Sequence, residues 1–295
     1  MQQREWKGRT GGGNFGQRSL FWFFRYVDVR FGYLGLRFIV VFYMIFARKR
    51  CMAIFHYFRQ RQGYSYLKSW WKTYRNHYLF GQTVLDKFAI FSGNGKQFRV
   101  TVEGQEYFKE AENSASGCLI ASAHVGNFEI AGYLLSSAVK PINGVIFGGE
   151  SPVMQQYRSE ILNANHIKLI PVTADMSHIY YIHNALKNGE FVCMPCDRIF
   201  SGNKKEKVDF LGAKAEFPAG FFYLGERLKT AALACFVMKE GSLHYRVYIR
   251  PLKTDVQSSR RGELKKVLAV SYVQELEKIL KCYPEQWYNF YEFWK

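Results

Sequence analysis

The sequence predicts an α/β fold: a central mixed, mostly parallel sheet flanked by helices, with an apolar helix near the N-terminus. Two observations lead to it. After residue 98, short apolar runs alternate with stretches of helical character, as in strands joined by crossover helices. Before that point, long apolar runs lie among basic residues. With 295 residues, the chain can form one large domain with an appendage.

We divide the chain at residue 50, into an N-terminal appendage (1–50) and a main domain (51–295). Residues 1–19 contain five glycines among polar residues, which predicts a flexible lead-in. From Phe31 to Phe46 the only charged residue is Arg37. Those 16 residues would rise only about 24 Å as a helix, less than the roughly 20 residues that a bilayer span needs.

One helix over residues 30–48 would place Arg30, Arg37 and Arg48 on a single stripe, because they are seven and eleven residues apart. Such a helix could lie in the membrane interface, or span the bilayer with its arginines snorkelling. A helix buried against the core is the alternative. The basic flank Arg48-Lys-Arg50 favours membrane contact.

The charge distribution separates two classes of partner. The chain carries a net charge of +17, and its first 80 residues hold 15 Lys or Arg against two acids. Nucleic acid or an anionic membrane could explain such a block. Because these basic residues are interleaved with long apolar runs, and because Phe, Tyr and Trp make up 18% of the chain, we expect an anionic membrane surface and no nucleic acid.

The main domain offers seven strands and six helices in alternation. The predicted strands are Phe98–Val102, Cys118–Ser122, Gly144–Phe147, Lys168–Val172, Phe191–Pro195, Ala232–Met238 and His244–Ile249. The predicted helices are Gln105–Glu112, Glu129–Ser137, Pro152–Asn163, Met176–Lys187, Ala219–Lys229 and Glu263–Lys281.

Six cysteines are present, with no secretory signal peptide before them, which predicts a reduced cytosolic environment. Cys193 and Cys196 have the spacing of a metal or redox pair. A zinc site would need a second ligand pair, and a redox pair normally opens a helix, whereas this one ends a strand. We therefore favour structural thiols and expect no metal.

The segment His124-Val-Gly-Asn-Phe-Glu129 follows a predicted strand and precedes a helix that Asn127 could cap. Ligands of open α/β sheets gather at the carboxyl ends of strands, so His124 stands where a general base is expected. Glu129 could hold its second nitrogen in the right tautomer. No Ser or Cys nucleophile accompanies the pair, so the attacking group would belong to the substrate. A core histidine and a first-turn glutamate are the structural alternative.

These features resemble the bacterial lipid A late acyltransferase family, which carries a His-x4-Asp/Glu signature. Other segments agree in order through nearly the whole chain: Trp6 to Gly16 with the apolar stretch after it, Asp197-Arg198, Phe210-Leu-Gly-Ala213, Pro218, Gly220 and Pro284-Glu-Gln-Trp287. The family pattern continues after Pro-Glu-Gln-Trp with basic residues, whereas this chain reads Tyr288-Asn-Phe-Tyr-Glu-Phe-Trp-Lys295. The lipid acceptor therefore stays open, with lipid A, aryl polyenes and amino-acid-containing lipids as alternatives.

The resemblance implies an acyltransferase at the cytoplasmic face of the bacterial inner membrane. An acyl thioester, on acyl carrier protein or coenzyme A, would be the donor and co-substrate, with no cofactor and no metal. His124 would activate a lipid hydroxyl, oriented by Glu129. Arg158, Asp197, Arg198 and Asn127 would contact the substrates. A non-catalytic membrane scaffold of the same fold is the other reading, and the intact His-x4-Glu pair argues against it.

Overall fold

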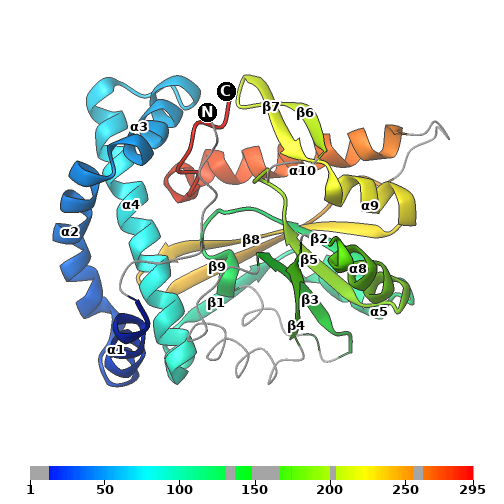
Figure 1. The fold of residues 1–295 in the computed structure, drawn as a ribbon, viewed down its shortest axis with the longest axis horizontal. Coiled ribbons are helices and arrows are strands. Elements are labelled where there is room, and N and C mark those ends of the chain that lie inside the picture. The colour runs from blue at the N-terminus through cyan, green and yellow to red at the C-terminus, as the bar shows by residue number, and fades with distance from the viewer. Residues whose placement is uncertain are drawn as a thin grey trace.

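The sheet at the centre of the molecule is mixed and mostly parallel, as predicted (Figure 1). The computed structural model describes residues 13–130, 137, 139–147, 167–173, 175–199, 204–254 and 262–294. Within them, seven strands pair in the order β1-β9-β8-β2-β5-β3-β4. The pair β8 and β9 is antiparallel, and each other neighbouring pair is parallel.

Every strand predicted from the sequence is present in this sheet. The strands are β1 (Arg99–Glu103), β2 (Cys118–Ser122), β3 (Ile142–Phe147), β4 (Ile167–Val172), β5 (Phe191–Pro195), β8 (Ala231–Gly241) and β9 (His244–Pro251). All five residues of β2 are buried. This explains its uninterrupted apolar sequence, because a central parallel strand is covered on both faces.

A two-stranded hairpin, β6 (Lys205–Phe210) and β7 (Ala213–Pro218), was not predicted. Its first strand begins Lys-Glu-Lys, so it lacks an apolar run that would have marked it. The turn between the strands holds Leu211 at φ 49° and Gly212 at φ 78°. Two successive residues with positive φ match the twist of a tight hairpin, so the segment Phe210-Leu-Gly-Ala213 forms a hairpin turn.

Four predicted helices are confirmed as α5 (Gln105–Asn113), α8 (Ser177–Lys187), α9 (Gly220–Leu228) and α10 (Glu263–Cys282). The predicted helix Pro152–Asn163 lies outside the described residues. Of Glu129–Ser137, the structure describes the backbone of a short 3₁₀ turn, Phe128–Ile130, and little more. The long helix α4 (Tyr66–Ala89) was missed, because the face that it buries is largely polar and includes Asn76, His77 and Asp86.

The N-terminal region forms three helices, α1 (Gly13–Tyr26), α2 (Val29–Phe46) and α3 (Arg48–His56). Two expectations were wrong. The lead-in predicted over residues 1–19 is helical from Gly13 onward, while residues 1–12 lie outside the described part. The single helix expected over 30–48 ends at Phe46, because Ala47 leaves helical geometry at φ −97° and ψ 38°. Arg48 therefore starts another helix, and the domain boundary set at residue 50 falls inside α3.

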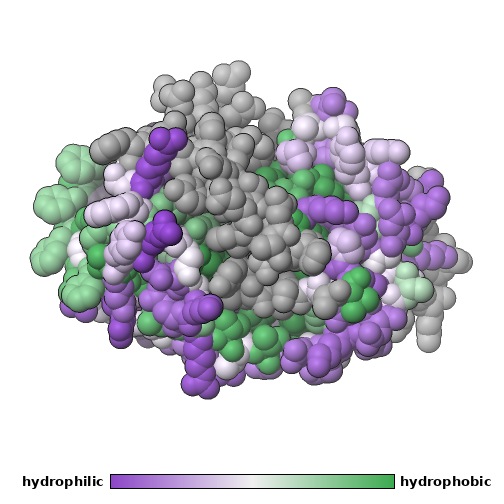
Figure 2. Space-filling view, turned by 90° about the horizontal axis from the view of Figure 1, so that it is seen from below, coloured by the Kyte–Doolittle hydropathy of each residue, from purple (hydrophilic) through white to green (hydrophobic). Residues whose placement is uncertain are grey.

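Helix α2 presents two different faces. Val29, Tyr33, Leu36 and Val40 are buried, on the side where α2 packs along α4 (Figure 1). The remaining apolar residues are mostly exposed, including Phe38, Phe42 and Phe46. Figure 2 shows apolar side chains gathered at the end of the molecule where Figure 1 places α2. With four of its 18 residues buried, α2 is not the fully covered core helix considered as an alternative.

A buried ion pair joins α4 to the sheet beneath α2. The Lys239 ammonium contacts the Asp86 carboxylate at 2.5 Å, and the two side chains are 2% and 0% exposed. The hydroxyls of Tyr33 and Tyr245 donate to the same carboxylate. Burial raises the pKa of the Asp86 carboxyl and lowers that of the Lys239 ammonium, while the contact between the groups opposes both shifts.

Replacing Lys239 by Met should destabilise the fold by about 3 to 5 kcal/mol, because it leaves the Asp86 carboxylate buried without its counter-charge. Lys205→Met is the matched control, since Lys205 pairs with Glu216 on the surface of the β6–β7 hairpin and should change little. Denaturant unfolding of the purified chain in detergent measures both. Equal stability of the two variants would contradict a structural role for the pair.

Candidate active site

The candidate site lies where β2 and β5 end. These strands are parallel neighbours, with Ser122 paired to Pro195. The Cys196 amide donates to the Ser122 carbonyl at 2.8 Å, so the segments that follow β2 and β5 leave the sheet side by side. His124 follows one strand by two residues, and Asp197 follows the other by two. The sheet register therefore brings this histidine and this aspartate to one point.

Asp197 binds His124 twice. The His124 ring Nδ1 lies 2.7 Å from Asp197 Oδ1, and the His124 main-chain N–H donates to Oδ2 at 2.9 Å. The indole N–H of Trp287 also donates to Oδ2, at 3.2 Å. The Asp197 side chain is 1% exposed, whereas that of His124 is 15% exposed. The carboxylate is thus fully enclosed, while part of the imidazole reaches the surface.

This geometry favours an ionised Asp197 carboxylate and a His124 ring with its proton on Nδ1. Burial works to raise the pKa of the Asp197 carboxyl, but the charge of His124, its hydrogen bonds and the nearby Arg198 together lower that pKa below its usual value of 3.8. Asp197 is therefore ionised at neutral pH. An ionised carboxylate accepts a hydrogen bond from Nδ1–H, and with the ring proton on Nδ1, Nε2 is the nitrogen suited to act as a base.

The C-terminal segment, residues 284–294, holds the histidine loop in place; we call it the C-terminal strap. The Tyr288 amide donates to the His124 carbonyl at 2.9 Å, and the Gly126 amide donates to the Gln286 carbonyl at 2.8 Å. Trp287 is fully buried. Its ring makes edge contacts with Tyr57, Phe210 and Phe293. The segment Pro284-Glu-Gln-Trp287 thus has a structural role, because its Trp287 indole donates a hydrogen bond to the buried Asp197 carboxylate.

Gly126 is required by the same loop. Its φ is +54°, and a Cβ added there would lie 1.9 Å from the Val237 carbonyl oxygen. That close approach lets the next amide, of Asn127, donate to the Val237 carbonyl at 2.8 Å. The loop between His124 and Glu129 is therefore pressed directly against β8.

Two predicted substrate-contacting residues have structural partners. The side-chain nitrogen Nδ2 of Asn127 donates to the Thr83 carbonyl at 3.1 Å and to the Tyr245 hydroxyl at 3.2 Å. These bonds connect the loop to α4 and β9. Arg198 donates from Nη2 to the Tyr288 carbonyl at 3.0 Å, which anchors the strap. These contacts assign both residues a part in the fold; their contact with substrate stays a prediction.

The structure places Asp197 at the ring nitrogen that we expected Glu129 to hold. The side chain of Glu129 and the whole of Arg158 lie outside the described residues, so their roles stay predictions. Sequence reasoning named Asp197 only as a substrate contact. Two strands that each end in an apolar run, followed at the same offset by a histidine and an aspartate, are the signal that could have paired them.

Cys193 and Cys196 lie in an environment that disfavours the reactive thiolate. Cys196 is fully buried, and burial raises the pKa of the Cys193 thiol to about 12. Among the described residues, no group of three His, Cys, Asp or Glu side chains could hold a metal ion. Structural thiols at Cys193 and Cys196 fit this environment.

Comparison with known proteins identifies the family. A model for bacterial lipid A biosynthesis acyltransferases matches residues 79–295. The chain belongs to this family. It is therefore an acyltransferase, as the sequence resemblance implied, and the match spans both His124 and the C-terminal strap. A search of curated proteins found no match.

One solved structure is similar at a distance. The crystal structure of the 1-acyl-sn-glycerophosphate acyltransferase PlsC from Thermotoga maritima has 16% sequence identity to this chain and a TM-score of 0.37. The match covers 88% of this chain and 99% of that chain. At this TM-score the likeness carries no argument, and the assignment of this acyltransferase rests on the family match.

The lowered pKa of Asp197 predicts a pH-dependent contribution to the stability of this acyltransferase. Because the folded-state pKa is below the unfolded value, ionised Asp197 stabilises the fold above about pH 4, and this contribution is lost as the pH falls through the folded pKa. Unfolding free energies of wild type and Asp197→Asn should therefore differ most at neutral pH and converge below pH 4. Asp209→Asn, at the exposed hairpin, is the control and should show a small, constant difference. A gap between wild type and Asp197→Asn that stays constant down to pH 3 would contradict the assignment.

Proposed function

We propose that this acyltransferase moves a fatty acyl chain from a thioester to a hydroxyl group of a lipid, with His124 as general base. The observation that carries the proposal is the contact of His124 Nδ1 with the buried carboxylate of Asp197. It prepares the opposite ring nitrogen to accept a proton, at the edge of the sheet where ligands of α/β proteins gather.

The proposed reaction is direct transfer. Nε2 of His124 accepts the proton of the acceptor hydroxyl while the hydroxyl oxygen attacks the thioester carbonyl. The tetrahedral intermediate then collapses, the carbon–sulfur bond breaks, and the imidazolium returns the proton to the departing thiolate. Asp197 stabilises the imidazolium that forms in between, which is the positioning role first assigned to Glu129. Glu129 lies in the same loop, and we keep it in the site as a second acidic residue.

The family match supports a lipid A precursor as the acceptor. Aryl polyenes and amino-acid-containing lipids remain alternatives, because the strap after Trp287 reads differently from the family pattern. The donor is acyl carrier protein or coenzyme A carrying the acyl group, with no further cofactor. Arg158 and Arg198 are proposed to bind anionic parts of these substrates, for which the forked guanidinium is suited.

We place the enzyme on the cytoplasmic face of the bacterial inner membrane, with α2 as its main contact. This helix is long and apolar enough to cross a membrane by length and composition. Its one buried face along α4 favours an interfacial position instead. Trp22 and Tyr26 of α1 are also exposed, and aromatic rings of this kind favour the membrane interface.

Replacing His124 by Ala should lower kcat by at least the ~10² to 10⁴ that a general base contributes. Asp197→Asn should also lower kcat, because an amide oxygen no longer stabilises the imidazolium, and Glu129→Ala should cost less than His124→Ala. The exposed His183 of α8 provides the control variant, His183→Ala. Acyl transfer from a labelled thioester to a lipid A precursor, measured with purified enzyme, decides the matter. Near-normal transfer by His124→Ala would exclude this mechanism.

Membrane binding through α2 can be tested without disturbing its buried face. The variant Phe38→Ser, Phe42→Ser, Phe46→Ser changes side chains that are 72%, 62% and 85% exposed. Each Phe side chain that the membrane buries stabilises binding by about 1.5 to 3 kcal/mol, so vesicle affinity should fall at least about ten-fold. The control replaces Tyr180, Tyr181 and Tyr223 by Ser, three exposed aromatics on α8 and α9. If only the control loses vesicle binding in cosedimentation, a different face meets the membrane.

A further inference from the structure

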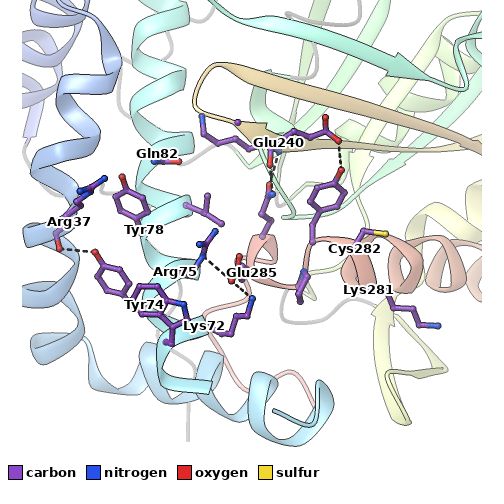
Figure 3. Close-up of a pocket in the computed structure, with 17 residues that line it drawn as sticks. Arg37, Lys72, Tyr74, Arg75, Tyr78, Gln82, Glu240, Lys281, Cys282 and Glu285 are labelled. Carbon is purple, nitrogen blue, oxygen red and sulfur yellow. Dashed lines mark hydrogen bonds and ion pairs between the residues drawn. The ribbon is translucent and has the colours of Figure 1, made fainter. Parts of the chain in front are cut away.

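A cavity whose lining does not include His124 lies between helices α2 and α4 and the end of α10 (Figure 3). Its volume is about 1040 Å³, and it is open to the surface. Its walls come from α2, α4, the end of β8 and the start of the C-terminal strap. Gln286 lines this cavity, while the next residue, Trp287, donates to Asp197. The strap thus borders the cavity with one residue and the candidate active site with the next.

The cavity is cationic. Arg37 of α2 and Lys72 and Arg75 of α4 line it (Figure 3), and Trp71 is a further lining residue. Lys72 and Arg75 share one carboxylate, that of Glu285, at 2.6 and 3.1 Å. Figure 3 shows both side chains directed at Glu285, while Lys281 extends away from them.

Positive charge remains after these contacts are counted. Lys72 and Arg75 carry two positive charges against the single negative charge of Glu285. The Arg37 guanidinium has no carboxylate within ion-pair distance in the described part of the chain, and only its main-chain carbonyl is engaged, by the Tyr74 hydroxyl. The other acid of the cavity, Glu240, is already bound by Arg246 and the Tyr283 hydroxyl. Two guanidinium groups on adjacent helices therefore line the same cavity, and the forked donors of guanidinium are suited to phosphate.

The surroundings indicate which phosphate. Arg37 lies on α2 between the exposed residues Leu34 and Phe38, and Trp71, at the rim, is 57% exposed. An apolar surface that continues into a cationic cavity matches a molecule with acyl chains on one side and a phosphate on the other. A free phosphate ion would gain no stabilisation from the apolar side chains beside the cavity.

We propose that this cavity binds the headgroup of an anionic phospholipid, with Arg37 and Arg75 contacting the phosphodiester and the acyl chains lying along α2. The inference rests on the membrane orientation proposed above, but it needs no assumption about the acyl-transfer reaction. A lipid held there would fix the depth and tilt of the enzyme on the membrane, next to the strap that supports Asp197.

The test uses the purified full chain and short-chain lipids below their micelle concentration, so that diffuse attraction to a charged surface does not contribute. Native mass spectrometry titrates dihexanoyl phosphatidylglycerol against dihexanoyl phosphatidylcholine. We expect one bound phosphatidylglycerol, preferred over phosphatidylcholine by about ten-fold or more, since Arg37 and Arg75 attract its net negative charge.

The variant Arg37→Gln, Arg75→Gln should remove this preference. Its fold should persist, because both side chains are exposed or half-exposed and Lys72 still pairs with Glu285. The control, Arg30→Gln, Lys68→Gln, removes two cations from the same two helices outside the cavity and should keep the preference. An equal preference in wild type and in the cavity variant would overturn the site.

Two further measurements test whether the cavity binds a free anion or a protein instead of a lipid. If inorganic phosphate displaces phosphatidylglycerol at equal concentration, the site serves a free anion and the proposal fails. If the cavity variant keeps its lipid preference but loses binding to acyl carrier protein, the cavity is a protein-docking site and the proposal also fails. Acyl transfer with soluble substrates is measured in parallel, so that failure of the lipid site and failure of the proposed reaction are separate results.

Discussion

The contact between His124 and the buried carboxylate of Asp197 is the interaction on which the rest of the candidate site depends. A carboxylate can be buried in its ionised form only when hydrogen bonds and a positive partner replace the water that it loses. Asp197 receives donors from the His124 ring, the His124 main chain and the Trp287 indole. Two of these come from the histidine loop and one from the C-terminal strap, so neither segment can move without exposing or stranding the charge.

The strap also links the candidate active site to helix α2. Gln286 binds the main chain of Lys239 through both ends of its amide, at 2.9 and 2.7 Å. The Lys239 side chain in turn contacts Asp86 and the hydroxyl of Tyr33, which belongs to α2. A continuous series of hydrogen bonds therefore joins the helix that we place at the membrane to the loop that carries His124. Docking of α2 on α4 is thus part of the support of the site rather than a separate anchor.

The two strands that carry the candidate site were predicted because each is a short run without charged residues. Cys118–Ser122 and Phe191–Pro195 are uninterrupted apolar or small runs, and the structure confirms both. Elements stabilised by polar contacts were missed. Helix α4 buries Asn76 and Asp86 against partners more than 150 residues away, and strand β6 alternates charged residues with buried ones. In neither case does the local pattern reveal the distant partner.

For the site, the sequence alone was enough to propose His124, because it follows an apolar strand and therefore lies at the carboxyl edge of the sheet. It also determined the family, through motifs that keep their order along the chain. The tertiary structure was needed to place Asp197 at Nδ1 of the ring. Glu129 is near in sequence, but Asp197, 73 residues away, follows the strand that pairs with β2. Strand order is set by packing between distant segments, and one chain's local periodicity does not encode it.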